Sequence, residues 1–390
     1  MEAVNTESDW GLKWRTNGYV FKTLPATELW DKIAKAAWSC ADPGLQFDTT
    51  INEWHTCPNS GRINASNPCS EYMFLDDTAC NLASINLAHF FDAETCSFDV
   101  ESFKHAVRFW TTTLEISVLM AQYPSQEIAQ GSFDFRTLGL GYANIGSVMM
   151  TAGIPYDSPE ALGFAGSITA IMTAESYATS AEIAKNLGTF VKYEENKEEM
   201  LRVIRNHRRT AFNKSEDEYE NLHTRPVGIS EEYAPAYLLA AARESWNKAL
   251  EMGEQYGYRN AQTTVLAPTG TIGLVMDCAT TGVEPDFALV KFKKLAGGGY
   301  FKIVNEAVPS ALKTLNYNES QINEVINYLK GYATLKSAPH ITHEVLKAKG
   351  FNDEDLAKLE KTLSGVFELA FAFNVWAMGE DCVKRLGSLY

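Results

Sequence analysis

Residues 67–87 read NPCSEYMFLDDTACNLASINL, and the first five of them bring an amide, a thiol and a carboxylate close together in the chain. Pro68 disfavours a helical conformation at Asn67, so the segment is predicted to be extended or looped. Alternate residues of an extended chain point the same way, which lets Asn67, Cys69 and Glu71 share one face. The pattern predicts a catalytic trio on a loop tip. The equally open alternative is a turn shaped by asparagine and proline around a small buried cysteine.

A second thiol, Cys80, follows in the same stretch, and two thiols at this separation can lie side by side on adjacent strands. A dithiol can supply two electrons by closing to a disulfide, whereas one thiol cannot. Residues 64–80 are therefore predicted to form one loop with redox or radical chemistry. Cys40 and Cys57 are the local alternatives as partners of Cys80.

A second motif follows the apolar pair Val265 and Leu266, where residues 267–273 read APTGTIG. Backbone N–H groups and threonine hydroxyls in such a loop can bind a diphosphate without a lysine, especially where the loop opens a helix. A tight structural turn is the open alternative. The motif lacks the Gly-Lys-Ser/Thr ending of a P-loop, and the glycines of residues 139–146 are spaced wrongly for a dinucleotide fingerprint.

The rest of the chain favours an α/β architecture whose functional groups lie on loops. Apolar residues at three- and four-residue steps predict helices over 27–40, 101–122, 159–186 and 236–256. Thr27 and Ser158 are predicted N-caps. The charges of both signs over 193–220 predict an exposed helix and loop. The basic, glycine-rich stretch 291–299 is predicted to be a surface loop, or else a mobile loop near a cofactor or a phosphate.

Composition bounds the classes of protein to which the chain can belong. With 390 residues and 45% hydrophobic content the chain can bury a large core. A net charge of -15 argues against a nucleic-acid-binding surface. No apolar run approaches the ~20 residues that span a bilayer, and the polar start is unlike a signal peptide, so we expect a cytoplasmic protein. The seven scattered cysteines, without a Cys-x-x-Cys spacing, predict neither a disulfide scaffold nor a metal site.

NPCSE followed by CNLASINL resembles the active-site region of ribonucleotide reductases, and the longer string from Trp54 to Leu87 resembles their adenosylcobalamin-dependent class II form. The resemblance implies that Cys69 carries the thiyl radical that abstracts the 3′ hydrogen of the ribose. It implies that Glu71 takes the 3′ hydroxyl proton, that Asn67 holds the sugar hydroxyls, and that Cys80 is half of the pair that reduces C2′. Substrate contacts are implied at Ser66, Pro68, Ser70, Pro268, Thr269, Gly270, Thr271 and Ile272.

The family fold is a ten-stranded α/β barrel, and the resemblance implies that residues 1–390 form an incomplete part of one. The resemblance further implies a ribonucleotide substrate, adenosylcobalamin as cofactor, and an external dithiol reductant such as thioredoxin. A companion chain would carry the missing N-terminal part with the other redox cysteine, and Cys278 is expected to be a packed thiol. Three alternatives stay open: a class I reductase large subunit, a nucleotide-binding module without turnover, and a glycyl-radical enzyme.

Overall fold

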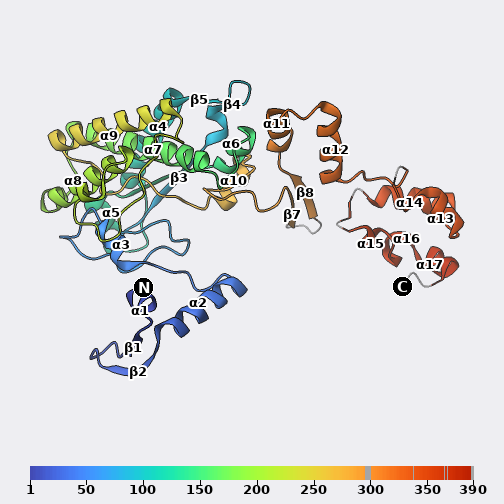
Figure 1. The fold of residues 1–390 in the computed structure, drawn as a ribbon, viewed down its shortest axis with the longest axis horizontal. Coiled ribbons are helices and arrows are strands. Elements are labelled where there is room, and N and C mark those ends of the chain that lie inside the picture. The colour runs from blue at the N-terminus through green and yellow to red at the C-terminus, as the bar shows by residue number, and fades with distance from the viewer. Residues whose placement is uncertain (295–299, 337, 364, 367, 388–390) are drawn as a thin grey trace.

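The computed structural model describes residues 1–294, 300–336, 338–363, 365–366 and 368–387. Figure 1 shows an N-terminal arm, a central α/β body and a C-terminal helical part. The arm and the segment after it comprise α1 (Glu2–Asn5), β1 (Asp9–Lys13), β2 (Val20–Pro25), α2 (Ala26–Cys40) and α3 (Asp48–Glu53). β1 and β2 form an antiparallel hairpin that leads directly into α2.

A small parallel sheet organises the central body. β3 (Asn81–Asn86) pairs in parallel with β6 (Leu138–Ala143). Residues 262–265 extend the sheet on the other side of β6, where the Leu140 N–H donates to the Thr263 carbonyl at 3.1 Å. Because the three segments run the same way, the loops that follow β3, β6 and Val265 begin at one edge of the sheet.

Helical crossovers join these strands, as parallel pairing requires. Between β3 and β6 lie η1 (Leu87–Phe90), β4 (Phe91–Asp92), β5 (Ser97–Phe98), α4 (Val100–Met120) and α5 (Gln126–Phe135). After β6 come α6 (Ile145–Thr151), α7 (Pro159–Leu187), α8 (Tyr193–Ala211), η2 (Glu216–Glu218), α9 (Ala236–Tyr256) and, beyond the third strand, α10 (Gly270–Val275). Ile85, Leu140 and Tyr142 share a buried core with α4 and α7, so these helices cover one face of the sheet.

The four predicted helices are confirmed as α2, α4, α7 and α9. Ser158 is confirmed as the N-cap of α7, because its hydroxyl accepts the Ala161 N–H at 3.1 Å. Thr27 was wrong as an N-cap: α2 has already begun at Ala26, since β2 runs straight into it and Pro25 occupies the cap position.

The expectation of an exposed helix over 193–220 was only half right. α8 is charged on one side, but its other side is buried and packs against α9. Met200, Val203 and Ile204 recur at helical spacing on the buried side. The many charged residues around this apolar stripe led to the prediction of an exposed helix, because overall composition does not show which side of a helix is apolar.

The C-terminal part extends away from the body to the right of Figure 1. It comprises β7 (Val290–Lys294), β8 (Tyr300–Val304), α11 (Ala307–Thr314), α12 (Glu319–Lys330), α13 (His343–Ala348), α14 (Asp353–Leu363), α15 (Leu369–Ala372), α16 (Val375–Met378) and α17 (Glu380–Leu386). α11 packs against α6, whereas α13 to α17 enclose a small core of their own. The glycines of the predicted 291–299 loop lie outside the described residues.

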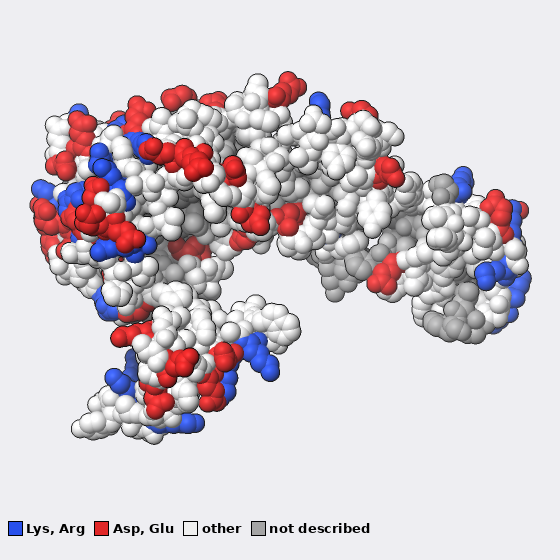
Figure 2. Space-filling model, in the orientation of Figure 1, with Lys and Arg blue, Asp and Glu red and all other residues white. Residues whose placement is uncertain are grey.

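No closed barrel forms within the described part of the chain, as expected of an incomplete one. In that part, no helix combines the length and the apolar composition needed to cross a membrane. Figure 2 shows lysine, arginine and carboxylate side chains intermixed at the end of the body formed by α8 and α9. At this end of the face shown, the cations therefore lie among anions.

Candidate active site

The cysteine loop is a closed turn. Ser66 and Met73 bridge in antiparallel fashion at its base. The Asn67 N–H donates to the Tyr72 carbonyl at 3.3 Å, and the Tyr72 N–H donates back to Oδ1 of Asn67 at 2.9 Å. Ser70 adopts a left-handed conformation with φ of 64° and donates its N–H to the Asn67 carbonyl. Of the two conformations predicted for this segment, extended or looped, the structure has the loop, which the Asn67 side chain closes.

Cys69 lies at the exposed tip of this turn and is a free thiol. The neighbouring Ser70 hydroxyl accepts a 2.7 Å hydrogen bond from the side chain of Gln46, which comes from the segment before α3. Gln46 thus anchors the tip of the turn through Ser70, while the Cys69 thiol stays accessible to a large reactant. Cys40 and Cys57 are also free, one exposed and one fully buried, so neither forms a disulfide with Cys80.

Glu71 points into a groove of about 330 Å³. The groove is lined by Ser70, Glu71, Thr169, Met172, Thr173, Thr264, Val265 and Leu266. Oε2 of Glu71 is buried and has no hydrogen-bond partner among the described residues. A buried carboxylate oxygen without a donor is costly, so it is suited to receive a hydroxyl proton from a ligand in the groove.

Cys80 is half-buried immediately before β3. Burial, with a further contribution from the Glu71 carboxylate, raises the pKa of the Cys80 thiol to about 12. A side chain at position 139 would collide with Sγ of Cys80, so Gly139 of β6 is what lets the thiol pack against the sheet. Cys80 is consequently kept as a neutral thiol close to the carboxylate of Glu71.

We expect the rate of Cys80 alkylation by iodoacetamide to rise about tenfold per pH unit between about pH 8 and pH 10, without a plateau. The thiolate is the nucleophile, and the pKa of this thiol lies near 12, so its thiolate fraction keeps increasing over this range. Glu71→Gln should shift the profile to lower pH because it removes the carboxylate. The rate can be followed by peptide mass spectrometry on the folded chain. A plateau near pH 9 would contradict the raised pKa.

The predicted phosphate loop, residues 267–273, directly follows the third strand, residues 262–265. Thr269 is buried in a left-handed conformation with φ of 52° and caps α10, which begins at Gly270. Its hydroxyl shares a 3.0 Å hydrogen bond with the Ser84 hydroxyl of β3 and donates to the Ala267 carbonyl at 3.2 Å. Thr269 thus joins the loop to the sheet, while Gly270, Thr271 and Ile272 remain exposed with first-turn N–H groups available to a ligand.

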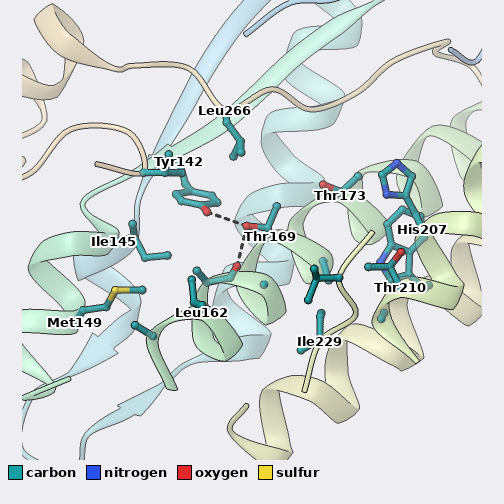
Figure 3. A pocket seen from close by; sticks show the side chains of 18 of the residues that line it. Tyr142, Ile145, Met149, Leu162, Thr169, Thr173, His207, Thr210, Ile229 and Leu266 are labelled. Atoms are coloured by element: carbon teal, nitrogen blue, oxygen red, sulfur yellow. Dashed lines mark hydrogen bonds between the residues drawn. The ribbon is translucent and has the colours of Figure 1, made fainter. Parts of the chain in front are cut away.

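A larger, mostly apolar groove of about 480 Å³ adjoins the one at Glu71 and shares Thr169, Thr173 and Leu266 with it. Figure 3 shows the Tyr142 hydroxyl directed at Thr169, with which it shares a 2.8 Å hydrogen bond. His207 forms another part of the wall, and burial lowers its pKa to about 4. The two grooves together form a continuous depression beside the third strand.

Two contributors to this site were missed in the sequence. Ser84 holds the phosphate loop, and the two-residue period of β3 could have placed it on the same face as Cys80. Tyr72 connects the cysteine loop to the sheet through contacts that no sequence spacing reveals.

Gly139 and Gly141 lie within β6 and allow close packing against the neighbouring segments. In the described part of the chain, no group of three or more His, Cys, Asp or Glu side chains could hold a metal ion.

The family model for the ribonucleotide reductase barrel domain matches residues 6–351, a range that contains the cysteine loop, Cys80 and the phosphate loop. The chain belongs to the ribonucleotide reductase family. The predicted barrel domain, residues 1–390, includes residues 1–5 and 352–390, which lie outside this match, and its bounds stay a prediction.

Relatives of this reductase chain are named for their cofactor. A vitamin B12-dependent ribonucleotide reductase of Bradyrhizobium diazoefficiens is 60% identical over 98% of this chain and 31% of its own length. The protein of the same name in Agrobacterium fabrum is 58% identical, with 98% and 30% covered. A vitamin B12-dependent ribonucleoside-diphosphate reductase of Mycobacterium tuberculosis is 30% identical over 72% of the chain. The chain spans about a third of the length of these relatives.

Proposed function

We propose that this chain supplies the radical cysteine and the substrate phosphate loop of a vitamin B12-dependent ribonucleotide reductase, which makes 2′-deoxyribonucleotides for DNA synthesis. The observation that carries the proposal is the buried carboxylate oxygen of Glu71, which lines a groove and has no partner among the described residues. The carboxylate acts electrostatically on the Cys80 thiol and lies two residues from the exposed Cys69. The family match and the names of the relatives support it, and those names favour this class over a class I subunit.

Each polar side chain has a place in the proposed reaction. The thiyl radical of Cys69 takes the 3′ hydrogen of the ribose, and the carboxylate of Glu71 takes the proton of the 3′ hydroxyl. Asn67 binds the sugar hydroxyls with its amide. The 2′ hydroxyl then leaves as water, and a dithiol that includes Cys80 supplies two electrons and two protons and closes to a disulfide. Cys69 finally returns its hydrogen to C3′ and becomes a thiyl radical again. The raised pKa of the Cys80 thiol suits this role, because the group must deliver a proton as well as an electron.

The phosphate loop is proposed to hold the substrate's phosphates. Leu266 lines the groove that contains Glu71, and the next residues are the loop itself, so a ribose beside Glu71 would carry its phosphates towards Gly270 and Thr271. Ser66, Pro68 and Ser70 would contact the sugar from the cysteine loop, and Pro268, Thr269 and Ile272 would complete the phosphate site. The name of the Mycobacterium tuberculosis relative favours a diphosphate substrate.

Adenosylcobalamin is the proposed form of the cofactor, and it would supply the radical chemistry when bound. The residues present fit this role in one respect: Cys69 lies at an exposed loop tip, so a group as large as a corrin can approach it without unfolding the chain. The turn formed by Asn67 and Tyr72 would hold the thiol in place during this approach. An external dithiol such as thioredoxin, and a companion polypeptide with the remaining part of the enzyme, are the proposed partners.

The proposal can be tested by assaying reduction of cytidine diphosphate with adenosylcobalamin and dithiothreitol, with the chain alone and with the remaining part of the reductase supplied. We expect deoxycytidine diphosphate only when cofactor and the remaining part are both present. Glu71→Gln should lower kcat at least about a hundredfold, the scale of a lost general base, while binding of the nucleotide persists. Nucleotide binding without product under every condition would instead indicate a binding module without turnover.

A further inference from the structure

The Tyr72 hydroxyl lies at a three-way junction beneath the cysteine loop. It shares one hydrogen bond with the Thr78 hydroxyl at 2.9 Å and another with the Thr137 hydroxyl at 2.8 Å. Tyr72 is only 8% exposed, and Thr137 is 1% exposed. Three parts of the chain thus meet at this hydroxyl: the cysteine loop, the segment before β3, and the start of β6.

Each partner of Tyr72 is itself fastened to the segment that leads to Cys80. The Thr137 hydroxyl donates to the carbonyl of Ala79 at 2.8 Å, directly before the thiol. The Thr78 hydroxyl lies 2.5 Å from the Leu75 carbonyl, so its single proton is divided between that oxygen and the Tyr72 hydroxyl, while Tyr72 donates its own proton to Thr137. The path from Tyr72 to Cys80 therefore consists of a buried hydrogen bond to Thr137, a partly buried one from Thr137 to Ala79, and the peptide unit that joins Ala79 to Cys80.

Tyr72 is equally well connected to the other side of the candidate site. Its peptide N–H holds the side chain of Asn67, and its preceding neighbour is Glu71. The ring lies in the core between Phe74 and the start of the sheet, which accounts for an aromatic residue at this position. Packing alone does not require the hydroxyl, because a buried phenol needs partners that a phenylalanine would not need.

We propose that Tyr72 is a positioning residue, whose hydroxyl holds the Glu71 carboxylate and the Cys80 thiol in fixed register on the two sides of the substrate. The catalytic importance of the distance between Glu71 and Cys80 rests on the proposed function. The hydrogen bonds of the Tyr72 hydroxyl that fix this distance do not depend on it. Without the hydroxyl, the segment that carries Cys80 opens more often, and the thiol loses its fixed distance from Glu71. Catalysis that needs both groups at once is sensitive to such a shift.

The test compares the alkylation rates of Cys80 and Cys69 by iodoacetamide within one sample of the full chain. In Tyr72→Phe, we expect the ratio of the Cys80 rate to the Cys69 rate to rise at least about fivefold, as loss of a buried hydrogen bond increases local opening. Thr137→Val should act in the same direction, and Thr137→Ser, which keeps a hydroxyl, should restore a ratio close to that of the unchanged chain.

The matched control is Tyr258→Phe. Tyr258 is fully buried in the same core, and its hydroxyl donates only to the Ala249 carbonyl, at 2.8 Å and away from the cysteine loop. We expect this variant to leave the ratio of alkylation rates unchanged. An unchanged ratio in Tyr72→Phe, or an equal rise in Tyr258→Phe, would overturn the proposal, provided that circular dichroism shows folded protein in both cases.

Activity gives a second readout in the complete reductase. Tyr72→Phe is expected to lower kcat about tenfold or more, with a change in KM below about twofold, because the reacting groups are displaced while phosphate binding is not. Equal losses of kcat in Tyr72→Phe and Tyr258→Phe would count against positioning. The two proposals can fail separately. If Tyr72→Phe raises the alkylation ratio but the unsubstituted reductase is inactive, the positioning role of the Tyr72 hydroxyl is kept and the proposed function is rejected.

Discussion

Replacement of Cys69 by alanine is expected to abolish deoxynucleotide formation in the complete enzyme, lowering kcat at least about a thousandfold, the scale on which loss of an indispensable catalytic group acts. The thiol is the proposed carrier of the radical, and no other side chain at the loop tip can take its place. Because Cys69 is exposed, the substitution leaves the core unchanged, and the thermal unfolding midpoint should stay within about 2 °C.

The matched control for Cys69 is Cys96→Ala, which removes another exposed thiol from the turn between β4 and β5. It should retain full activity. Product formation is measured by chromatography of the deoxynucleotide with adenosylcobalamin and dithiothreitol present. Substantial turnover by Cys69→Ala would mean that the radical resides elsewhere, and the proposed role of the loop would have to be abandoned.

Substitution of Glu115 is expected to cause a large loss of stability, because its carboxylate is the centre of a buried network of charged and polar side chains. The Glu115 carboxylate of α4 accepts hydrogen bonds from Nε of Arg136 at 2.7 Å, from Nε of Arg259 at 2.8 Å and from the side-chain amide of Asn260 at 2.7 Å. Glu115→Gln leaves two guanidinium groups without a counter-charge, and we expect the free energy of unfolding to fall by about 3–5 kcal/mol. Urea unfolding followed by circular dichroism measures this change.

Glu182→Gln is the control for Glu115. Glu182 of α7 pairs with Arg108 of α4 through both of its oxygens, but the pair is largely exposed. Solvent screening limits the contribution of such a pair, and the loss should be at most about 1 kcal/mol. If the two variants lose the same stability, the network around Glu115 does not behave as a buried one.

Local patterns in the sequence were sufficient for the long helices. The periodicity of 159–186 and 236–256 predicted α7 and α9 to within one residue, because apolar residues that recur at three- and four-residue steps are a signal of nearby positions only. Local patterns failed at Thr27, because the start of α2 depends on how β2 leads into it. They also failed over α8, where the many charged residues gave no sign that one side of the helix is buried.

What the sequence alone determined is the chemical content of the site: a thiol, an amide and a carboxylate in NPCSE, a second thiol at Cys80, and a small-residue loop after Val265. Only the tertiary structure decided their arrangement. It turned Asn67 back onto Tyr72, buried one oxygen of Glu71 in a groove, and joined Thr269 to Ser84. The contact between Asn67 and Tyr72 is local, but the groove at Glu71 and the contact of Thr269 with Ser84 link segments far apart in the chain. The geometry of these distant contacts is set by packing around the sheet, which the order of nearby residues does not specify.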